Sequence, residues 1–317
     1  MNFAKKKCIL LLIYSLLSAL PLLSQVDSTF YDFGDFGGII LLDSIVVSAS
    51  RNSLDIQDFV DMVRNDRSFY KAFNNIRTLS YTADNHINMY NKKKKIIAEY
   101  YSLTKQYFDG ECRTMEVLQE DIKGNFFKKK RKYRYYTAKM YDHLFFTKEK
   151  ICHEKTDVIE HSQTKGIDKH VAELKKLIFN PGEKADVPFM GNKTEIFSKE
   201  MTAYYDYSIT SETYKDTIDC YVFSVKIKPE FADNKKRKTV IKELETYFEK
   251  TTFQVIARNY NLAYWTTLYD FDVNIEIELK KIKNFYVPDF IKYQGWWDIP
   301  LKKPEIAVFS AKFYDFH

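Results

Sequence analysis

The stretch FDVNIEIELK, from Phe271 to Lys280, decides the fold of this chain. Apolar and polar residues alternate through all ten of its positions. A period of two is typical of a strand that buries one face and exposes the other. A helix, with 3.6 residues per turn, would scatter these apolar side chains around its axis. Because strands with one wet face occur in antiparallel sheets, the sequence predicts a large antiparallel sheet.

Aromatic residues are unusually frequent in the composition. The 317 residues include 24 Tyr, 25 Phe and 3 Trp, together 16% of the chain. Tyr and Phe favour the half-buried surface of a pleated sheet, so the composition indicates a β-rich fold. With 9 Gly and 7 Pro, the chain lacks the composition of a fibrous or low-complexity protein. Its length allows one large domain or two smaller ones.

Two helices and further strands are predicted along the chain, which makes the fold class α+β. Apolar residues at helical spacing predict a helix over residues 55–75, capped by Asp55 and interrupted near Asn65-Asp66. A second helix is predicted over residues 168–179, ended by Asn180-Pro181-Gly182. Alternation and turn signals predict strands over residues 96–108, 112–118, 126–137, 140–146, 201–214, 218–227, 243–248, 253–260 and 306–313.

Residues 1–25 have the pattern of a secretory signal peptide. Lys5, Lys6 and Lys7 precede an apolar run that extends from Cys8 to Leu23 and is too short for a comfortable membrane span. Removal of this segment takes away three lysines and no acidic residue, so the formal charge falls from +6 to +3. The sequence therefore predicts an exported protein.

Residues 26–45 are polar and punctuated by glycine, and residues 26–50 are interpreted as a flexible leader. Residues 51–317 are predicted to form a single β-rich domain, because no Gly/Ser/Pro linker divides them. Two sub-lobes, about 51–180 and 190–317, are the alternative. Cys112, Cys152 and Cys220 follow the predicted signal, and their spacing leaves open one disulfide plus a free thiol, or no disulfide.

The sequence contains no catalytic signature. Cys152-His153, His161 and His170 lack the close pairs that zinc sites use. Carboxylate pairs such as Glu276 and Glu278 share the wet face of one strand, whereas acid/base catalysis needs two carboxyl groups in different environments within a cleft. The sequence therefore predicts a protein that is not an enzyme and that has no metal and no cofactor.

A basic run interleaved with aromatic residues occupies residues 126–137. In a cytosolic chain this pattern would indicate nucleic-acid binding, but export excludes that partner and favours lipid head groups or lipopolysaccharide phosphates. The alternative is a solvated strand edge that lysines protect against aggregation. The candidates for contact with an anionic surface are Lys128, Lys129, Lys130, Arg131, Lys132 and Arg134.

Two adjacent tryptophans, Trp296 and Trp297, follow Gly295. Neighbouring residues of a strand point to opposite faces, so one tryptophan can close the core while the other meets a partner. An aromatic platform for a carbohydrate or lipid is one hypothesis. A tryptophan plug at the rim of the sheet is the other.

The strands of residues 201–227, the hairpin around Glu249-Lys250-Thr251-Thr252-Phe253 and the strand 271–280 together resemble the half-barrel fold of the periplasmic lipoprotein carriers and their outer-membrane receptor relatives. This resemblance covers residues 76–313, and the chain as a whole resembles an exported, Bacteroidetes-type envelope protein. It implies a large, curved, half-barrel-like antiparallel sheet whose concave apolar face is covered by a few helices. It also implies a location in the periplasm or at the outer membrane.

The same resemblance implies binding of an apolar ligand, a lipid or a lipoprotein acyl chain, between the sheet and the helices. An outer-membrane or envelope protein is the other expected partner, and no nucleic acid is expected. The residues expected to line the ligand site are Phe253, Val255, Phe271, Val273, Ile275, Ile277, Leu279, Trp296 and Trp297. One alternative is that these residues fill an ordinary core. Another is a non-enzymatic interaction module that binds a protein, a glycan or an anionic lipid surface through the basic aromatic strands and the two tryptophans.

Overall fold

A computed structural model describes residues 54–147, 149–152, 177–185, 190–232, 238–265, 270–298 and 303–317. All of these residues lie in one compact unit, Phe33–His317. The predicted signal peptide and leader lie outside the described residues. So do His153, His161, His170 and most of the helix predicted over residues 168–179, of which Leu177, Ile178 and Phe179 are described as helical.

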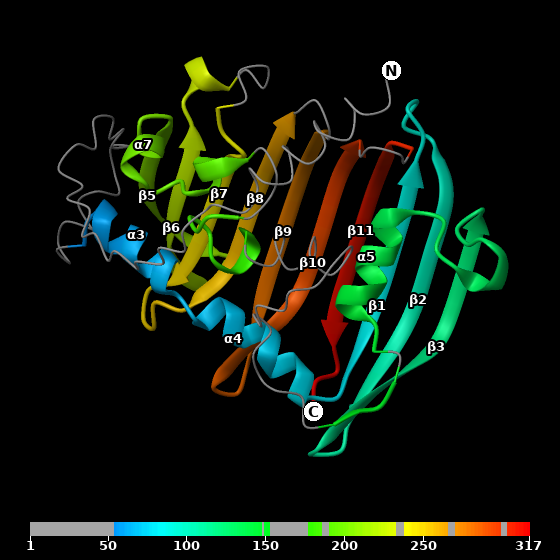
Figure 1. Cartoon of the computed structure of the whole chain (residues 1–317). Helices are drawn as coiled ribbons and strands as arrows, with labels where there is room; N and C mark the ends of the chain where they lie inside the picture. The colour runs from blue at the N-terminus through cyan, green and yellow to red at the C-terminus, as the bar shows by residue number, and fades with distance from the viewer. Residues whose placement is uncertain are drawn as a thin grey trace, which may run out of the picture. The chain divides into compact units, whose positions relative to one another are not determined.

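The described strands form one eleven-stranded sheet, and every strand pair in it is antiparallel (Figure 1). The order across the sheet is β4-β3-β2-β1-β11-β10-β9-β8-β7-β6-β5. The strands are β1 Tyr81–Tyr90, β2 Ile96–Phe108, β3 Cys112–Gly124, β4 Ile151–Cys152, β5 Tyr205–Tyr214, β6 Ile218–Ile227, β7 Ile241–Glu249, β8 Val255–Trp265, β9 Asp270–Ile282, β10 Phe285–Asp298 and β11 Glu305–Tyr314.

The last strand joins the two parts of the sequence in the middle of the sheet. β11 pairs with β10 on one side and with β1 on the other, so that Ala311 lies opposite both Ile291 and Asn85. Ser80 and His317 exchange two backbone hydrogen bonds of 3.0 and 3.1 Å just beyond this seam. The strands that precede residue 125 and those that follow residue 204 therefore share one continuous sheet.

The register of β9 gives the sheet one apolar face and one charged face. Ile275 pairs with Tyr260 of β8 and Tyr293 of β10, which places apolar side chains in rows across the strands. On the opposite face Glu276 pairs with Lys292 at 3.2 Å and Glu278 with Lys215. The alternation that defines the stretch from Phe271 to Lys280 thus separates the core from solvent.

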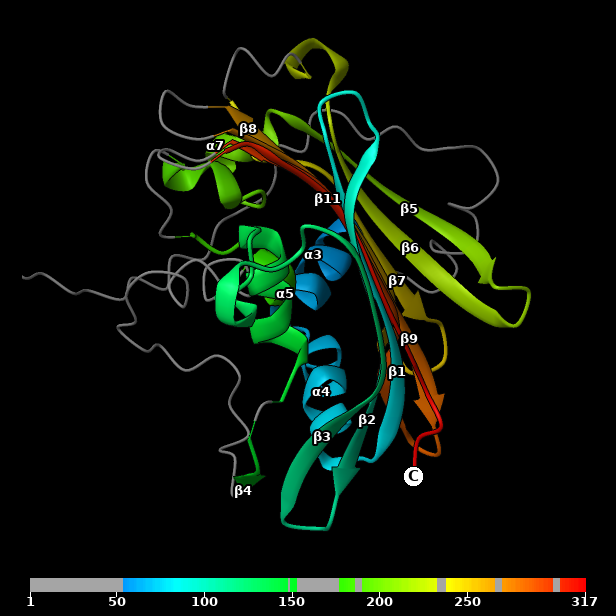
Figure 2. The same cartoon turned by 90° about the vertical axis from the view of Figure 1, so that its right-hand side faces the viewer.

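The helices cover the apolar face of the sheet. Figure 2 shows bowed strands with α3, α4 and α5 on their concave side. The helices are α3 Ile56–Asn65, α4 Ser68–Asn75, α5 Tyr136–Phe145 and α7 Lys199–Thr202, and the 3-10 turns are η1 Ile76–Thr78, η2 Lys129–Arg131, η3 Gly191–Thr194 and η4 Pro229–Phe231. The predicted fold class, a large curved antiparallel sheet with a few covering helices, is confirmed.

The pair α3 and α4 matches the helix predicted over residues 55–75, including its interruption. Asp55 caps α3 through a reciprocal capping box with Asp58. Phe59 of α3 is fully buried, and its ring centroid lies 5.6 to 6.0 Å from those of Tyr221, Phe223 and Phe248. The apolar stripe read from the sequence is therefore the face that packs on β6 and β7.

The strand predicted over residues 140–146 is wrong, because this segment belongs to the helix α5. The buried residues Ala138, Tyr141 and Asp142 fall at helical spacing. The start of the helix is stabilised by Glu305 of β11, whose carboxylate accepts hydrogen bonds from Tyr136 N at 2.7 Å and Thr137 N at 2.9 Å. This cap comes from a residue far along the chain, so the local sequence gave no sign of it.

The strand predicted over residues 126–137 is also wrong. This segment forms a turn closed by a single bridge between Phe127 and Tyr133, with η2 at its tip. Lys130 and Arg131 have positive φ angles of 58° and 54°, which are incompatible with a strand. The aromatic residues cluster with each other rather than alternating, and the charged residues are left in solvent.

Candidate functional site

A cavity of about 360 Å³ lies between the concave face of the sheet and the elements that cover it. Its floor comes from β1, β2, β3, β9, β10 and β11, and its cover comes from α4, η1, the end of α5, β4 and the segment at 178–179. The lining residues are Phe73, Ile76, Arg77, Tyr81, Gln106, Arg113, His143, Leu144, Phe145, Phe146, Thr147, Ile151, Ile178, Phe179, Ile275, Ile277, Pro288, Ile291, Tyr293, Phe309 and Phe313. A concave site of this size with mainly apolar walls is typical of a small-molecule binding pocket.

Aromatic contacts fix the walls of this cavity. Phe73 of α4 packs edge-on against Phe179, with ring centroids 5.0 Å apart. Tyr293 and Phe309 stack across β10 and β11 with centroids 4.6 Å apart. Phe145 of α5 packs against Phe309 at 6.2 Å. Helix and sheet therefore meet around the cavity through large, weakly polar surfaces.

The residues that were expected to line a ligand site lie at different places. Ile275 and Ile277 line the cavity. Val255, Val273 and Leu279 are buried but do not line it. Phe253 has a positive φ of 55° in the turn before β8 and is 38% exposed, with its ring stacked on Tyr221.

Trp296 and Trp297 lie on opposite faces of β10. Trp297 pairs with Phe271 on the concave side, where the two rings stack with centroids 5.2 Å apart. Its indole Nε1 donates a hydrogen bond to the hydroxyl of Tyr293. A Cβ atom at Gly295 would collide with this hydroxyl and its ring, so glycine is required for Tyr293 to reach across. Trp296 pairs with Asp272 on the charged face and is half-buried.

One end of the cavity is polar and basic. The Nη1 atom of Arg113 donates to Thr147 Oγ1 at 2.5 Å and to Gln106 Oε1 at 3.4 Å. Gln106 in turn donates to the backbone carbonyls of Ile76 and Leu79 at 3.0 and 2.8 Å. Burial raises the pKa of Tyr81 to about 12, and the charges of Arg113 and Arg77 act against this shift. Four of these polar residues, Tyr81, Gln106, Arg113 and Thr147, therefore meet where β2, β3 and the end of α5 converge.

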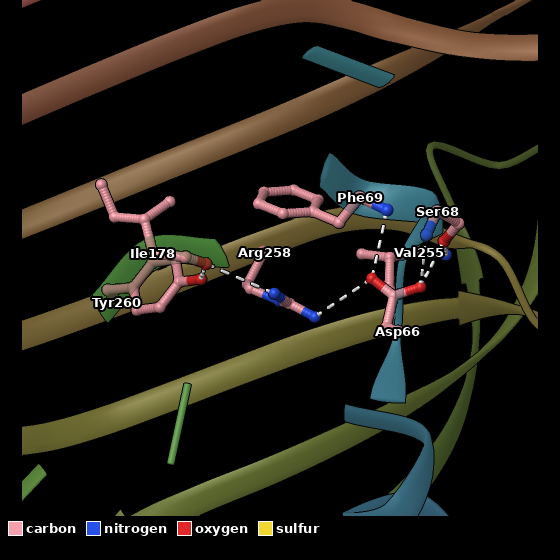
Figure 3. A network of polar contacts seen from close by, with 7 residues as sticks. All are labelled: Asp66, Ser68, Phe69, Ile178, Val255, Arg258 and Tyr260. Atoms are coloured by element: carbon pink, nitrogen blue, oxygen red, sulfur yellow. Dashed lines mark hydrogen bonds and ion pairs between the residues drawn. The ribbon is translucent and has the colours of Figure 1, made fainter. Parts of the chain in front are cut away.

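A buried arginine holds the cover on the other side of the cavity. Arg258 of β8 has no exposed surface, and its guanidinium lies 3.8 Å from Asp66 and 4.5 Å from the ring centroid of Phe69 (Figure 3). Arg258 donates a hydrogen bond of 3.4 Å to the carbonyl of Ile178, and Tyr260 donates to the same carbonyl. Because Ile178 and Phe179 line the cavity, these bonds fix part of its wall.

Asp66 connects this arginine to the start of α4. Its carboxylate accepts hydrogen bonds from Ser68 N, Ser68 Oγ and Phe69 N at 2.9, 2.6 and 3.1 Å. Ser68 Oγ also accepts from Val255 N at 3.0 Å. The start of α4, the start of β8 and the segment at 178–179 are thus linked by one polar network beneath the helices (Figure 3).

A second buried polar network lies under α5. Tyr141 donates to Asn85 Oδ1 at 2.6 Å, and Asn85 donates to Ser102 O at 3.2 Å and Thr104 Oγ1 at 3.1 Å. Burial raises the pKa of Tyr141 well above its ordinary value, so the phenol stays neutral. Since these groups bind each other, the network fixes α5 on β1 and β2.

The basic candidates for an anionic surface are all exposed. Lys128, Lys129, Lys130, Arg131, Lys132 and Arg134 lie in the turn that follows β3. Arg131 lies over the ring of Phe127 at 4.8 Å and forms an ion pair with Glu120. The cluster is therefore a loop next to the edge of the sheet, and its six residues do not reach the cavity.

The described residues contain no group of three or more His, Cys, Asp or Glu side chains that could hold a metal ion. No helix among them is long and apolar enough to cross a membrane.

Lys242 and Asp272 are a partly buried pair of opposite charges. Burial lowers the pKa of Lys242 to about 8 and raises the pKa of Asp272, and the charge of each residue opposes the shift of the other. This couple lies on the charged face of β7 and β9 rather than at the cavity.

The polar residues of the cavity were not identified from the sequence. Arg113 follows a cysteine in a strand rich in charged residues, and Arg77 is one of many isolated basic residues. The burial of Arg258 could have been predicted from the sequence. Arg258 occupies an inward position in a strand where Tyr260, Leu262 and Tyr264 alternate with outward residues. A charged residue within an apolar periodicity indicates a buried, functional or structural charge.

No protein-family model and no curated protein matches this chain. Among solved structures, the fold is similar to a LolA superfamily protein from Nitrosomonas europaea at 11% identity, covering 79% of this chain and 91% of that one, with a TM-score of 0.22. A DUF1329 family protein from Desulfovibrio piger matches at 10% identity over 84% and 92%, with a TM-score of 0.23. A putative outer membrane lipoprotein-sorting protein domain from Vibrio parahaemolyticus matches at 8% identity over 75% and 84%, with a TM-score of 0.25. At these identities and TM-scores the matches define no function for this chain.

Proposed function

We propose that this chain is a non-enzymatic protein of the cell envelope that binds an apolar ligand, a lipid or an acyl chain, between its concave sheet and its helices. The observation that carries the proposal is the cavity of about 360 Å³ with mainly apolar walls. Protein interiors are normally packed to the density of organic crystals. A space of this size between well-ordered aromatic walls therefore suits a ligand better than it suits a filled core.

The way in which the cavity is covered supports the proposal. Part of its cover, the segment at 178–179, is attached to the sheet by polar contacts of Arg258 and Tyr260 with Ile178 O. Such contacts can be broken and remade without unfolding the sheet beneath them. This segment can thus move aside to admit a chain while the register of the strands remains unchanged.

The predicted export supports a lipid as the ligand class. A protein outside the inner membrane meets lipids, lipoprotein acyl chains and envelope proteins. These are the partners that we propose, with the periplasm or the outer membrane surface as the location. The single β-rich domain that holds the cavity is part of the same proposal.

The test is native mass spectrometry of the mature protein purified from its own envelope, followed by solvent extraction of the bound material. We expect added mass that extracts as lipid, together with uptake of a fluorescent fatty-acid probe. Ile277→Phe places a larger side chain in the cavity and should reduce probe uptake at least fivefold. Glu276→Gln, on the opposite face of the same strand, is the matched control and should leave uptake unchanged.

A clean unliganded mass with no uptake of the probe would overturn the carrier proposal. The second candidate would then be an envelope interaction module. It is favoured by exposed apolar side chains on β3, where Val117 and Leu118 are 47% and 48% exposed beside the basic turn at residues 128–134. Capture of an envelope protein that is lost on substitution of these two residues would support that function.

A further inference from the structure

Two basic turns leave the sheet at the same corner. One connects β1 to β2 at residues 91–95, and the other follows β3 at residues 125–134. Because β2 pairs antiparallel with both β1 and β3, the start of β2 and the end of β3 lie at the same end of the sheet (Figure 1). Gly124, the last residue of β3, pairs with Ala98 near the start of β2. Residues 91–97 and 125–134 are called the basic corner below.

The charges in the two turns have one sign. Neither turn contains Asp or Glu. Their basic residues, all of them exposed, are Lys92, Lys93, Lys94, Lys95, Lys128, Lys129, Lys130, Arg131, Lys132 and Arg134. In the part of the chain that the structure describes, Arg131 forms an ion pair with Glu120, and the other basic residues of the turns form none. Of the neighbouring carboxylates, Glu99 is paired with Lys123, so the corner carries an excess of positive charge.

The backbone presents these charges at the tips of ordered turns. In the first turn, Asn91 Oδ1 accepts hydrogen bonds from two lysine backbone amides at 2.9 and 3.1 Å. Lys94, Lys130 and Arg131 have φ angles of 57°, 58° and 54°, in the left-handed region that favours glycine. A glycine would fit this backbone with less strain, so the property that the basic residue adds is its charged side chain.

Two exposed isoleucines lie directly beside the first turn. Ile96 and Ile97 are 47% and 43% exposed. Ile97 is the extra residue of a bulge between β1 and β2, and β3 ends opposite Ala98, so neither neighbouring strand draws these side chains into the core. The corner therefore combines lysines with adjacent apolar side chains, as surfaces that enter the interface of a bilayer do.

We propose that the basic corner docks on the surface of an anionic phospholipid bilayer, with the lysines of both turns against lipid phosphates and with Ile96 and Ile97 in the interface. An acidic protein would match the charge, but a bilayer offers both an anionic surface and an apolar layer beneath it. None of the residues of the corner lines the cavity, so the proposal goes beyond the lipid-binding function and does not depend on it.

The experiment is co-sedimentation of the full mature protein with two kinds of vesicle. One kind contains phosphatidylglycerol and phosphatidylethanolamine, and the other contains phosphatidylcholine and phosphatidylethanolamine. We expect at least tenfold tighter binding to the vesicles with phosphatidylglycerol. Raising the salt from about 0.1 M to about 0.5 M should reduce this preference, because exposed charges are then screened over shorter distances.

The first variants test whether the charge acts locally. Lys93→Gln/Lys94→Gln should weaken binding to the anionic vesicles at least tenfold, since each basic residue near such a surface contributes about fivefold. Lys280→Gln/Lys283→Gln is the matched control. It also removes two exposed lysines, but these lie at the opposite end of the sheet, where β9 turns into β10, and binding should change less than about twofold.

Two further variants test the rest of the corner. Lys129→Gln/Lys130→Gln should weaken binding as Lys93→Gln/Lys94→Gln does, because the second turn faces the same surface. Ile96→Ser/Ile97→Ser keeps every charge and should weaken binding at least threefold, with the larger loss at high salt, where the apolar contribution dominates. All four side chains are exposed, so these variants should fold as the wild type does.

Equal affinity of the wild type for the two kinds of vesicle would overturn the inference. So would a loss in Lys280→Gln/Lys283→Gln as large as in Lys93→Gln/Lys94→Gln, because the attraction would then come from net charge alone. Binding to heparin without binding to vesicles would assign the corner to a soluble polyanion instead. Uptake of the fatty-acid probe should be unchanged in Lys93→Gln/Lys94→Gln, so a failure of docking is distinguishable from a failure of the lipid-binding function.

Discussion

Arg258 and Asp66 form a pair of opposite charges inside the protein, and the two residues are not equally well solvated by their surroundings. Asp66 accepts three hydrogen bonds at the start of α4, whose positive dipole end also favours a carboxylate. Arg258 has a long bond of 3.4 Å to Ile178 O and a cation-π contact with Phe69, while its Nε has no hydrogen-bond partner among the described residues. The buried charge of Arg258 therefore depends on Asp66 for its stabilisation more than the charge of Asp66 depends on Arg258.

This asymmetry predicts different costs for removing each partner. Asp66→Asn keeps one acceptor oxygen at the start of α4, loses the other, and leaves Arg258 buried without its counter-charge. It should lower the free energy of unfolding by about 3–5 kcal/mol. Arg258→Met leaves Asp66 with its three donors and should cost less than about 2 kcal/mol. Urea denaturation of both variants measures the difference. A larger loss in Arg258→Met than in Asp66→Asn would show that the pair is not organised in this way.

At the scale of single elements, the disulfide fixes a strand that could not otherwise form. β4 has two residues and makes two residue pairs with β3, Cys112 with Cys152 and Arg113 with Ile151. Two pairs are too few to hold a strand at the edge of a sheet. The bond between Cys112 and Cys152, 40 residues apart, supplies the missing constraint, and Ile151 is thereby kept at the cavity.

Removal of the disulfide should therefore destabilise the protein measurably. By the chain-entropy relation, a closed loop of about 40 residues corresponds to about 4 kcal/mol in the free energy of unfolding. We expect Cys112→Ala/Cys152→Ala to lose about this amount in urea denaturation, and reduction of the wild type with dithiothreitol to have the same effect. Cys220→Ala is the control, because Cys220 is a buried free thiol and this variant should keep its sensitivity to reductant. A wild-type midpoint that does not respond to reductant would contradict the prediction.

The elements that depend on neighbouring residues were predicted from the sequence, whereas the elements that depend on contacts with residues far along the chain were not. The strand from Phe271 to Lys280 and the helices α3 and α4 follow from periodicity and from the Asp55 cap, which are properties of neighbouring residues. The helix α5 depends on Glu305, which is 169 positions beyond Tyr136. The cavity shows the same division. Ile275 and Ile277 were among the expected lining residues because they alternate, whereas Arg77 and Arg113 come from η1 and β3, two separate elements that only the tertiary fold places at the same cavity.

At the scale of the whole sheet, the position of β11 couples the two parts of the sequence. β11 makes nine residue pairs with β1 and eight with β10. Rows of apolar side chains continue across it, as in Ile87, Phe309 and Tyr293, which are adjacent in three neighbouring strands. The strands β1 to β3 therefore share their core with β5 to β11, and a loss of packing on one side lowers the stability of both.

This coupling can be tested because the tryptophans are all on one side of the seam. The 3 Trp residues are Trp265, Trp296 and Trp297, in β8 and β10. Ile87→Ala removes a buried side chain from β1 and should cost about 2–5 kcal/mol. We expect its urea transition to shift equally by far-ultraviolet circular dichroism, which reports on every strand, and by tryptophan fluorescence. Leu244→Ala in β7 is the matched control on the tryptophan side, and it should shift both signals in the same way.

A fluorescence transition that stays at its wild-type midpoint in Ile87→Ala would mean that the strands on either side of β11 unfold separately. That result would also weaken the proposed lipid-binding function, because the cavity takes its floor from both sides of this strand. Arg113 and Tyr81 belong to the N-terminal strands, and Ile275 and Ile277 belong to the C-terminal ones. A ligand that contacts both groups binds only the intact sheet, so a ligand at 100 times its Kd should raise the stability of both parts together by about 2.7 kcal/mol.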